Sequence, residues 1–173
     1  CVLRWGRLYP RKSVDIFFQV ASDNTGQDLS GMVIRNANQK SVVMIAKEME
    51  EKISRIRKEG DPDYKKMKSS MSLIPGFLSY LFVSLTGHLM YALNLWSPLL
   101  GVPRDPFGSA MVTNVGSLGL ETAFVPLVPY SRCPLLLAVS AIKEKAIVKD
   151  GKIQIAKTIQ ICATFDHRLI DGV

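Results

Sequence analysis

The residues with the clearest potential for chemistry surround His167, one of two histidines in the chain. Asp166, Arg168 and Asp171 flank it where an apolar, strand-like segment ends. The ordinary pKa of histidine lies close to neutrality, so an imidazole can accept a proton and return it during a reaction. Spacing alone does not separate a catalytic histidine from an ordinary surface one. The other histidine, His88, lies in an uncharged stretch, where we expect a packed or interfacial side chain.

Short apolar segments bounded by turn residues predict the strands that would position His167. The segment 14–20 is continuous enough to be buried on both faces, and we expect it to pair with, or lie near, the segment 31–35. The Asp150-Gly151 pair indicates a hairpin, because both turn positions favour positive φ. The last strand carries His167 at its C-terminal end. Strands are expected over residues 14–20, 31–35, 109–115, 135–142, 146–148, 153–155 and 158–165.

One helix is predicted between Ser41 and Glu59, where apolar residues recur every three or four positions. Ser41 is placed to cap its start, and Gly60 is placed to end it. Acid–base pairs four residues apart usually mark a solvated helix face. The pairs that we expect on the outer face are Glu48 with Lys52 and Glu51 with Arg55.

Residues 69–103 contain no Asp, Glu, Lys or Arg, which sets this stretch apart from the rest of the chain. Apolar residues within it recur at helical spacing and predict a helix with one strongly apolar face. The first expectation is a protein interface or an element that covers the substrate. The alternatives are interfacial membrane association, with Lys65, Lys66 and Lys68 meeting anionic headgroups, and a true membrane span.

Composition narrows the possible classes of protein. The chain has 173 residues, 47% of them hydrophobic, which is enough for one substantial core, and this excludes disordered and fibrous classes. The net charge of +7 is dispersed and suits anionic ligands, but no arginine stripe with aromatics points to nucleic acid. The three cysteines, Cys1, Cys133 and Cys162, lack metal-ligand spacing and are odd in number. They therefore favour a reducing compartment, the cytoplasm or an organelle matrix.

Three blocks of sequence resemble one family. Residues 167–172, His-Arg-Leu-Ile-Asp-Gly, resemble the His-x-x-x-Asp-Gly signature of the chloramphenicol acetyltransferase-like superfamily. With Asp166 included, the motif is similar to the catalytic domain of 2-oxo acid dehydrogenase dihydrolipoamide acyltransferases. Residues 110–119, which contain Thr113, resemble that family's Phe-Thr-Ile-Ser-Asn-Leu-Gly segment, and residues 33–41 resemble its strand-then-helix entry.

The resemblance implies an α/β fold with a mixed sheet flanked by helices, and transfer of an acyl group between coenzyme A and a dihydrolipoyl-like thiol. It makes His167 the general base that deprotonates the attacking thiol. It makes Thr113, where the family has serine, the donor to the tetrahedral oxyanion. Asp171 would pair with an arginine and hold the histidine loop. The resemblance also implies a homotrimer in which the histidine and the hydroxyl of one site come from neighbouring chains.

The expected partners are an acyl-CoA and a thiol acceptor, with a lipoyl group possible on a partner domain, and no metal or nucleic acid. Residues 1–173 are expected to form a partial acyltransferase catalytic domain, with an uncharged insertion at 69–103 and further sequence beyond both ends. Peripheral membrane association through this insertion stays open.

Two departures from the family leave an alternative function open. The family's Leu-Val-Val-Pro-Val-Ile strand corresponds to residues 29–34, which lack the proline, so the substrate is not specified. Thr113 stands in place of serine. The alternative is therefore a catalytically silent homologue that acts as a scaffold or assembly subunit and is possibly membrane-associated.

Overall fold

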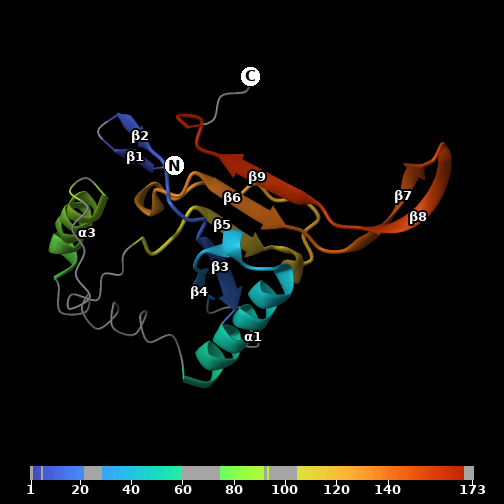
Figure 1. The fold of residues 1–173 in the computed structure, drawn as a ribbon, viewed down its shortest axis with the longest axis horizontal. Coiled ribbons are helices and arrows are strands. Elements are labelled where there is room, and N and C mark those ends of the chain that lie inside the picture. Colours follow the sequence, from blue (N-terminus) through green and yellow to red (C-terminus); the bar gives the residue numbers. More distant parts are fainter. Residues whose placement is uncertain are drawn as a thin grey trace.

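The computed structural model describes residues 2–4, 6–21, 29–59, 75–91, 93 and 105–169. Its centre is a mixed five-stranded sheet in the order β4-β3-β5-β6-β9 (Figure 1). The pairs β3–β5 and β5–β6 are parallel, whereas β3–β4 and β6–β9 are antiparallel. These strands are β3 (Ile16–Ala21), β4 (Leu29–Ile34), β5 (Ala110–Asn114), β6 (Leu135–Val139) and β9 (Ile161–Phe165). The expected α/β class with a mixed sheet is confirmed.

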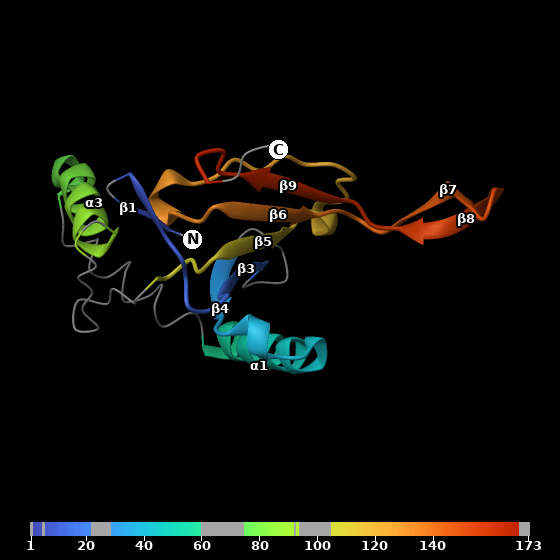
Figure 2. The same ribbon diagram turned by 45° about the horizontal axis from the view of Figure 1, so that its top comes forward.

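The hairpin of β3 and β4 has the expected position, but β3 is not buried on both faces. Its side chains are half-buried apart from Gln19, which is exposed. In β4, the alternating residues Met32 and Ile34 are buried, as a strand with one covered face requires. Figure 2 shows helix α1 (Val42–Glu59) alongside one face of β3 and β4. A single helical layer therefore explains why the strand is only half-buried.

Helix α1 begins at the predicted residue. The Ser41 hydroxyl accepts a hydrogen bond from the Met44 amide at 3.3 Å, as an N-cap residue does. The Glu48–Lys52 pair, however, does not lie on a solvated outer face. Lys52 Nζ donates to the carbonyl of Val33 in β4 at 2.7 Å, and Glu48 also pairs with Lys40. The pair thus ties the helix to the sheet edge, because the long lysine stem reaches back across the helix side.

A buried carboxylate fixes the start of β5. Asp15 accepts hydrogen bonds from Arg35 Nη1 and from the Asn36 amide, each at 2.8 Å. Arg35 also donates to the Asp105 carbonyl at 3.0 Å, and the Ser109 amide donates to the Asp15 carbonyl at 2.6 Å. The network joins the ends of β3 and β4 to the segment that enters β5, and Arg35 and Asn36 belong to the family-like block at residues 33–41.

Strands β6 and β9 leave the sheet together and continue as a projecting hairpin (Figure 1). Ser140 and Gln160 close the sheet: the Ser140 amide donates to the Gln160 carbonyl at 3.0 Å, and the Gln160 amide donates to Ser140 Oγ at 2.9 Å. The chain then forms β7 (Lys143–Lys149) and β8 (Lys152–Thr158), which are longer than predicted. Asp150 and Gly151 have φ of 52° and 73°, so the predicted turn is confirmed. The strand predicted over 135–142 therefore ends at Val139, and the segment predicted over 158–165 as a single strand is divided between β8 and β9.

The remaining described elements are short, apart from one helix. Strands β1 (Val2–Arg4) and β2 (Arg7–Tyr9) form a separate two-stranded sheet. Three 3-10 turns are η1 (Ala37–Gln39), η3 (Gly116–Leu118) and η4 (Pro129–Ser131). Helix α3 (Gly76–Tyr91) lies within the uncharged stretch, whose other residues fall outside the described part except Pro75 and Leu93. It is apolar around most of its circumference, not along one face as predicted. Within the described residues, no helix has the combined length and apolar character that crossing a bilayer requires.

Candidate active site

His167 lies in a turn directly after β9. The turn is closed by the Leu169 amide, which donates to the Asp166 carbonyl at 2.9 Å. Its base is attached to the sheet side by the Asp166 amide, which donates to the Pro134 carbonyl at 2.9 Å, just before β6 begins. The His167 side chain is exposed. The backbone around the imidazole is therefore fixed by its neighbours, while the ring itself is accessible to a substrate.

Asp166 and Arg168 form a two-point ion pair on either side of the histidine. Arg168 donates through Nε to Asp166 Oδ1 at 2.9 Å and through Nη2 to Oδ2 at 2.7 Å, and its own amide donates to Oδ1 at 3.1 Å. These hydrogen bonds lower the pKa of Asp166 below its ordinary value, and the same pairing raises the pKa of Arg168. Arg168 thus belongs to the charge network of the loop, although its side chain remains 65% exposed.

Asp171 and Gly172 lie outside the described residues. The expected pairing of Asp171 with an arginine therefore remains a prediction.

Thr113 lies near the C-terminal end of β5, with a half-buried side chain. Its hydroxyl donates to Gln19 Oε1 at 3.0 Å, and the two residues are register partners in the parallel pair of β3 and β5. No sequence pattern pointed to Gln19, because 94 residues separate it from Thr113. Only the pairing of β3 with β5 brings the amide to the hydroxyl.

The glycine turn after Thr113 packs closely against the end of β6. A Cβ on Gly116 would lie 2.7 Å from backbone atoms of Ser140 and Ala141, so no larger residue fits without movement. Asn114 Oδ1 accepts the Gly116 amide at 2.9 Å, and the Val115 amide donates to the Val139 carbonyl at 2.9 Å. The close approach explains the Asn-x-Gly spacing and fixes the backbone that follows Thr113.

The sheet places Thr113 and His167 far apart within one chain. Thr113 is level with Ala138 in β6, which is level with Cys162 in β9. The end of β9 lies three residues beyond Cys162, which is about 10 Å along the strand. Thr113 and β9 are also two strand spacings apart across the sheet, so the end of β9 is about 14 Å from Thr113. His167 lies beyond that end. The two side chains therefore do not meet at one carbonyl group within a single chain.

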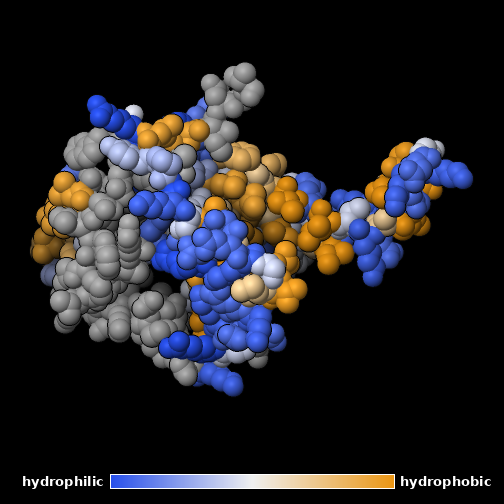
Figure 3. Space-filling view, viewed as in Figure 1, coloured by the Kyte–Doolittle hydropathy of each residue, from blue (hydrophilic) through white to orange (hydrophobic). Residues whose placement is uncertain are grey.

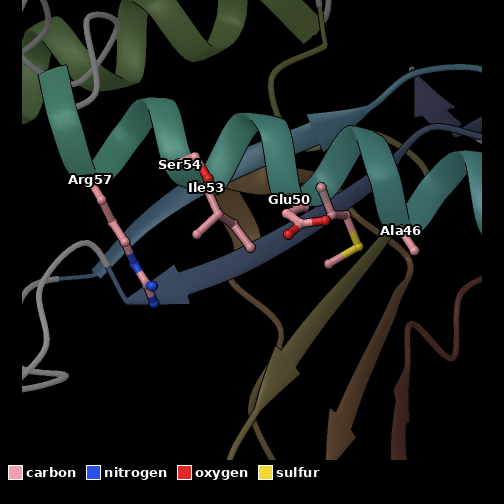
Figure 4. A pocket seen from close by; sticks show the side chains of 6 residues that line it. Ala46, Glu50, Ile53, Ser54 and Arg57 are labelled. Carbon is pink, nitrogen blue, oxygen red and sulfur yellow. The ribbon is translucent and has the colours of Figure 1, made fainter.

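An open hollow lies elsewhere, along α1 (Figure 4). Its lining consists of α1 residues alone: Ala46, Met49, Glu50, Ile53, Ser54 and Arg57. Neither Thr113 nor His167 contributes to it, so the hollow does not mark the candidate site. His88 lies on α3 with an exposed side chain, on an element separate from both candidate residues.

Comparison with known proteins connects these residues to one family. Residues 107–173 match the family model described as 2-oxoacid dehydrogenases acyltransferase (catalytic domain), a region that includes both Thr113 and His167. The dihydrolipoyllysine-residue acetyltransferase component of the pyruvate dehydrogenase complex of Bacillus subtilis is 41% identical over 64 residues. That stretch is 37% of this chain and 14% of the relative, so the match covers a small part of the relative's length.

Solved structures extend the likeness to nearly the whole chain. Dihydrolipoamide acetyltransferase of Azotobacter vinelandii has a TM-score of 0.60 and 24% identity over 99% of this chain. That structure was studied for the roles of a serine, a histidine and an asparagine in the catalytic mechanism. The cubic core of the pyruvate dehydrogenase multienzyme complex has a TM-score of 0.57 and 23% identity over 94%. The chain spans about half of each solved chain, 53% and 49%. The fold is therefore that of dihydrolipoamide acetyltransferase cores, and the resemblance to the catalytic domain of the 2-oxoacid dehydrogenase acyltransferases is confirmed, with residues 107–173 matching its family model.

Proposed function

We propose that this chain is part of a coenzyme A-dependent acyltransferase that moves an acyl group between coenzyme A and a dihydrolipoyl-like thiol. The observation that carries the proposal is the family match over residues 107–173, which contains both a hydroxyl on β5 and an accessible histidine after β9. The curated relative is named for acetyl transfer to a lipoyllysine residue. Residues 1–173 then form a partial catalytic domain.

His167 acts as the general base. A thiol has an ordinary pKa near ~8.5 and is mostly protonated at neutral pH, so the imidazole takes its proton as the sulfur attacks. The ring needs access to the thiol, which its exposure provides, and a fixed backbone, which the Asp166 contacts provide. The pair of Asp166 with Arg168 also braces the turn that carries His167, and in this proposal Asp171 holds the loop from its other end.

Thr113 stabilises the tetrahedral intermediate. When the thiolate adds to the thioester carbonyl, the carbonyl oxygen becomes an oxyanion, and the Thr113 hydroxyl turns from Gln19 to donate to it. The intermediate collapses by breaking the bond to the other sulfur, which leaves as a thiol after taking the proton from His167. One proton and one acyl group have then been exchanged between two sulfur atoms, and no metal takes part.

The active unit is a homotrimer or a larger homo-oligomer. The separation of about 14 Å or more between Thr113 and the His167 turn supports a site in which each chain supplies one group and a neighbour supplies the other. One of the structures with this fold is a cubic core. A symmetric oligomer places the same two surfaces together at every interface.

Acyl transfer from acetyl-CoA to dihydrolipoamide tests the proposal. We expect His167→Ala to lower turnover by several orders of magnitude, because the reacting thiol loses its base. His88→Ala is the matched control, since it removes the other histidine from an element outside the site, and it should retain turnover. A wild-type protein without transfer activity would favour the silent-homologue alternative, and a His167→Ala variant with near-normal turnover would remove the mechanism.

A further inference from the structure

Helix α3 is attached to the rest of the molecule by its small and polar side. Ser79, Val83, Thr86 and Gly87 fall on one side of the helix and are half-buried. At Gly87 a Cβ would lie 3.3 Å from the ring of Tyr130 in η4, so the ring reaches the helix backbone. Tyr130 in turn packs edge-on against Phe107, with ring centroids 6.4 Å apart. A helix of a globular protein normally turns its small polar residues outward, and α3 does the reverse.

The rest of the circumference of α3 carries large apolar residues, and Leu78 and Phe82 are among those that are exposed. Phe77 and Tyr80 are 83% and 84% exposed, and Leu81 and Leu85 are more than half exposed. Tyr80 and Leu81 follow Phe77 by three and four residues, and Leu85 follows Leu81 by four. Ser84 and His88 are the polar side chains on the same side. Figure 3 shows the described surface of α3 as predominantly apolar. A ridge of this kind indicates a partner, since single exposed apolar residues are common but a contiguous row is not.

Exposed basic residues lie at the end of the molecule that carries α3. The helix itself contains no charged residue. Figures 1 and 2 place the hairpin of β1 and β2 at the same end of the molecule as α3. In β2, Arg7 is exposed beside Leu8 and Tyr9, which are also exposed. Arg132, two residues after the Tyr130 that contacts Gly87, is a further exposed basic residue.

We propose that α3 docks this protein on the surface of an anionic lipid bilayer, lying in the plane of the interface without crossing it. Apolar side chains enter the acyl-chain boundary, and the neighbouring cations meet the headgroups. Its 16 residues span about 24 Å, which is shorter than the roughly 30 Å hydrocarbon layer. The anchoring of the small, polar side at Tyr130 keeps the apolar ridge turned away from the body of the protein.

A protein groove fits the ridge less well than a lipid surface. The ridge is convex, so a second copy of the chain would have to offer an apolar groove of matching length. The hollow along α1 is lined in part by Glu50 and Arg57, which an apolar ridge would leave desolvated without partners (Figure 4). A bilayer accepts a convex apolar ridge without any complementary shape. The proposal does not depend on acyl transfer.

Flotation of the full-length protein with lipid vesicles tests the proposal. We expect binding to vesicles that contain phosphatidylglycerol and much weaker binding to phosphatidylcholine alone. Phe77→Ser with Leu81→Ser should lower the bound fraction at least tenfold, and Arg7→Glu should weaken binding at low salt. The matched control is Ile153→Ser with Ile155→Ser, which removes similarly exposed apolar residues from β8 and should float like the wild type. Thermal unfolding checks that each variant is folded.

Three results would overturn the proposal. The wild-type protein fails to float with anionic vesicles, or the β8 control loses binding as strongly as the α3 variant. The third is self-association in the absence of lipid that the α3 substitutions abolish in sedimentation velocity, which would assign the ridge to a second copy of the chain.

Discussion

Two inactive variants should restore activity to each other if Thr113 and His167 of different chains share a site. The perturbation is to co-express Thr113→Ala, which keeps the histidine, with His167→Ala, which keeps the hydroxyl. Within one chain the end of β9 is about 14 Å from Thr113, and His167 lies beyond it, so no chain of either kind can form a complete site alone. A complete site arises only where an intact histidine faces an intact hydroxyl across an interface.

The expected recovery follows from counting interfaces in a trimer. With equal amounts of the two variants and random assembly, each interface has a probability of about one quarter of forming a complete site. Such a site pairs the histidine of a Thr113→Ala chain with the hydroxyl of a His167→Ala chain. Mixed trimers selected by two tags hold one complete site in about three. The Thr113→Ala protein alone should retain roughly a hundredth of wild-type turnover, because one oxyanion donor contributes about 3 kcal/mol. The recovered activity should therefore stand well above either variant alone.

The assay is acetyl transfer from acetyl-CoA to dihydrolipoamide, measured per chain on tandem-purified mixed oligomers. A second mixture provides the control: wild type with a chain that carries both substitutions. In this mixture without tag selection, shared sites predict about one quarter of wild-type activity, whereas sites within one chain predict about one half. If mixed oligomers form and the complementing pair stays as inactive as its parents, the shared-site geometry is wrong.

Two further predictions concern the parts of the fold that hold the site. Gly116→Ala should lower the free energy of unfolding by about 2 kcal/mol and the Tm by several degrees, because the added Cβ meets backbone atoms at 2.7 Å. Gly76→Ala is the control, since its Cβ meets nothing within 4 Å. It should be neutral or slightly stabilising in thermal unfolding. Burial raises the pKa of Asp15, but the hydrogen bonds from Arg35 and from the Asn36 amide outweigh it, so the net pKa lies below the ordinary value of 3.8. The carboxylate then stabilises the fold above pH 3.8 and loses this contribution as the pH falls through the lower folded pKa. Asp15→Asn should therefore be less stable than the wild type at neutral pH. Its free energy of unfolding should also fall less steeply with pH in acid denaturation. A neutral Gly116→Ala variant, or an unchanged acid profile for Asp15→Asn, would contradict these two arguments.

Local sequence patterns predicted the elements that depend on local interactions. The Ser41 cap and the Asp150-Gly151 turn are formed by neighbours within a few residues, and the structure has both of them. Runs of apolar residues predicted the strand that carries Thr113 and the strand that precedes the histidine.

Features that depend on the register between distant segments were not predicted. Gln19 reaches Thr113 only because β3 pairs with β5. Lys52 binds the Val33 carbonyl only because α1 crosses the sheet at that level, and a pair four residues apart carries no information about which side of the helix faces the sheet. The boundary between the sheet and the projecting hairpin likewise depends on a contact between segments 20 residues apart, the hydrogen bonding of Ser140 with Gln160. The orientation of α3 is set by Tyr130, outside the helix.

The projecting hairpin of β7 and β8 has a consequence for the order in which the chain folds. All of its pairings are local, from Lys149 with Lys152 to Lys143 with Thr158, and such hairpins close within about 1–10 μs. The parallel pair of β3 and β5 joins segments 94 residues apart, and contacts of such long range form slowly. A newly made chain therefore displays a finished ribbon, with Val148, Ile153 and Ile155 bare, before its sheet is complete. Since the edges of such a ribbon can pair with those of other chains, refolding yield should fall as the protein concentration rises.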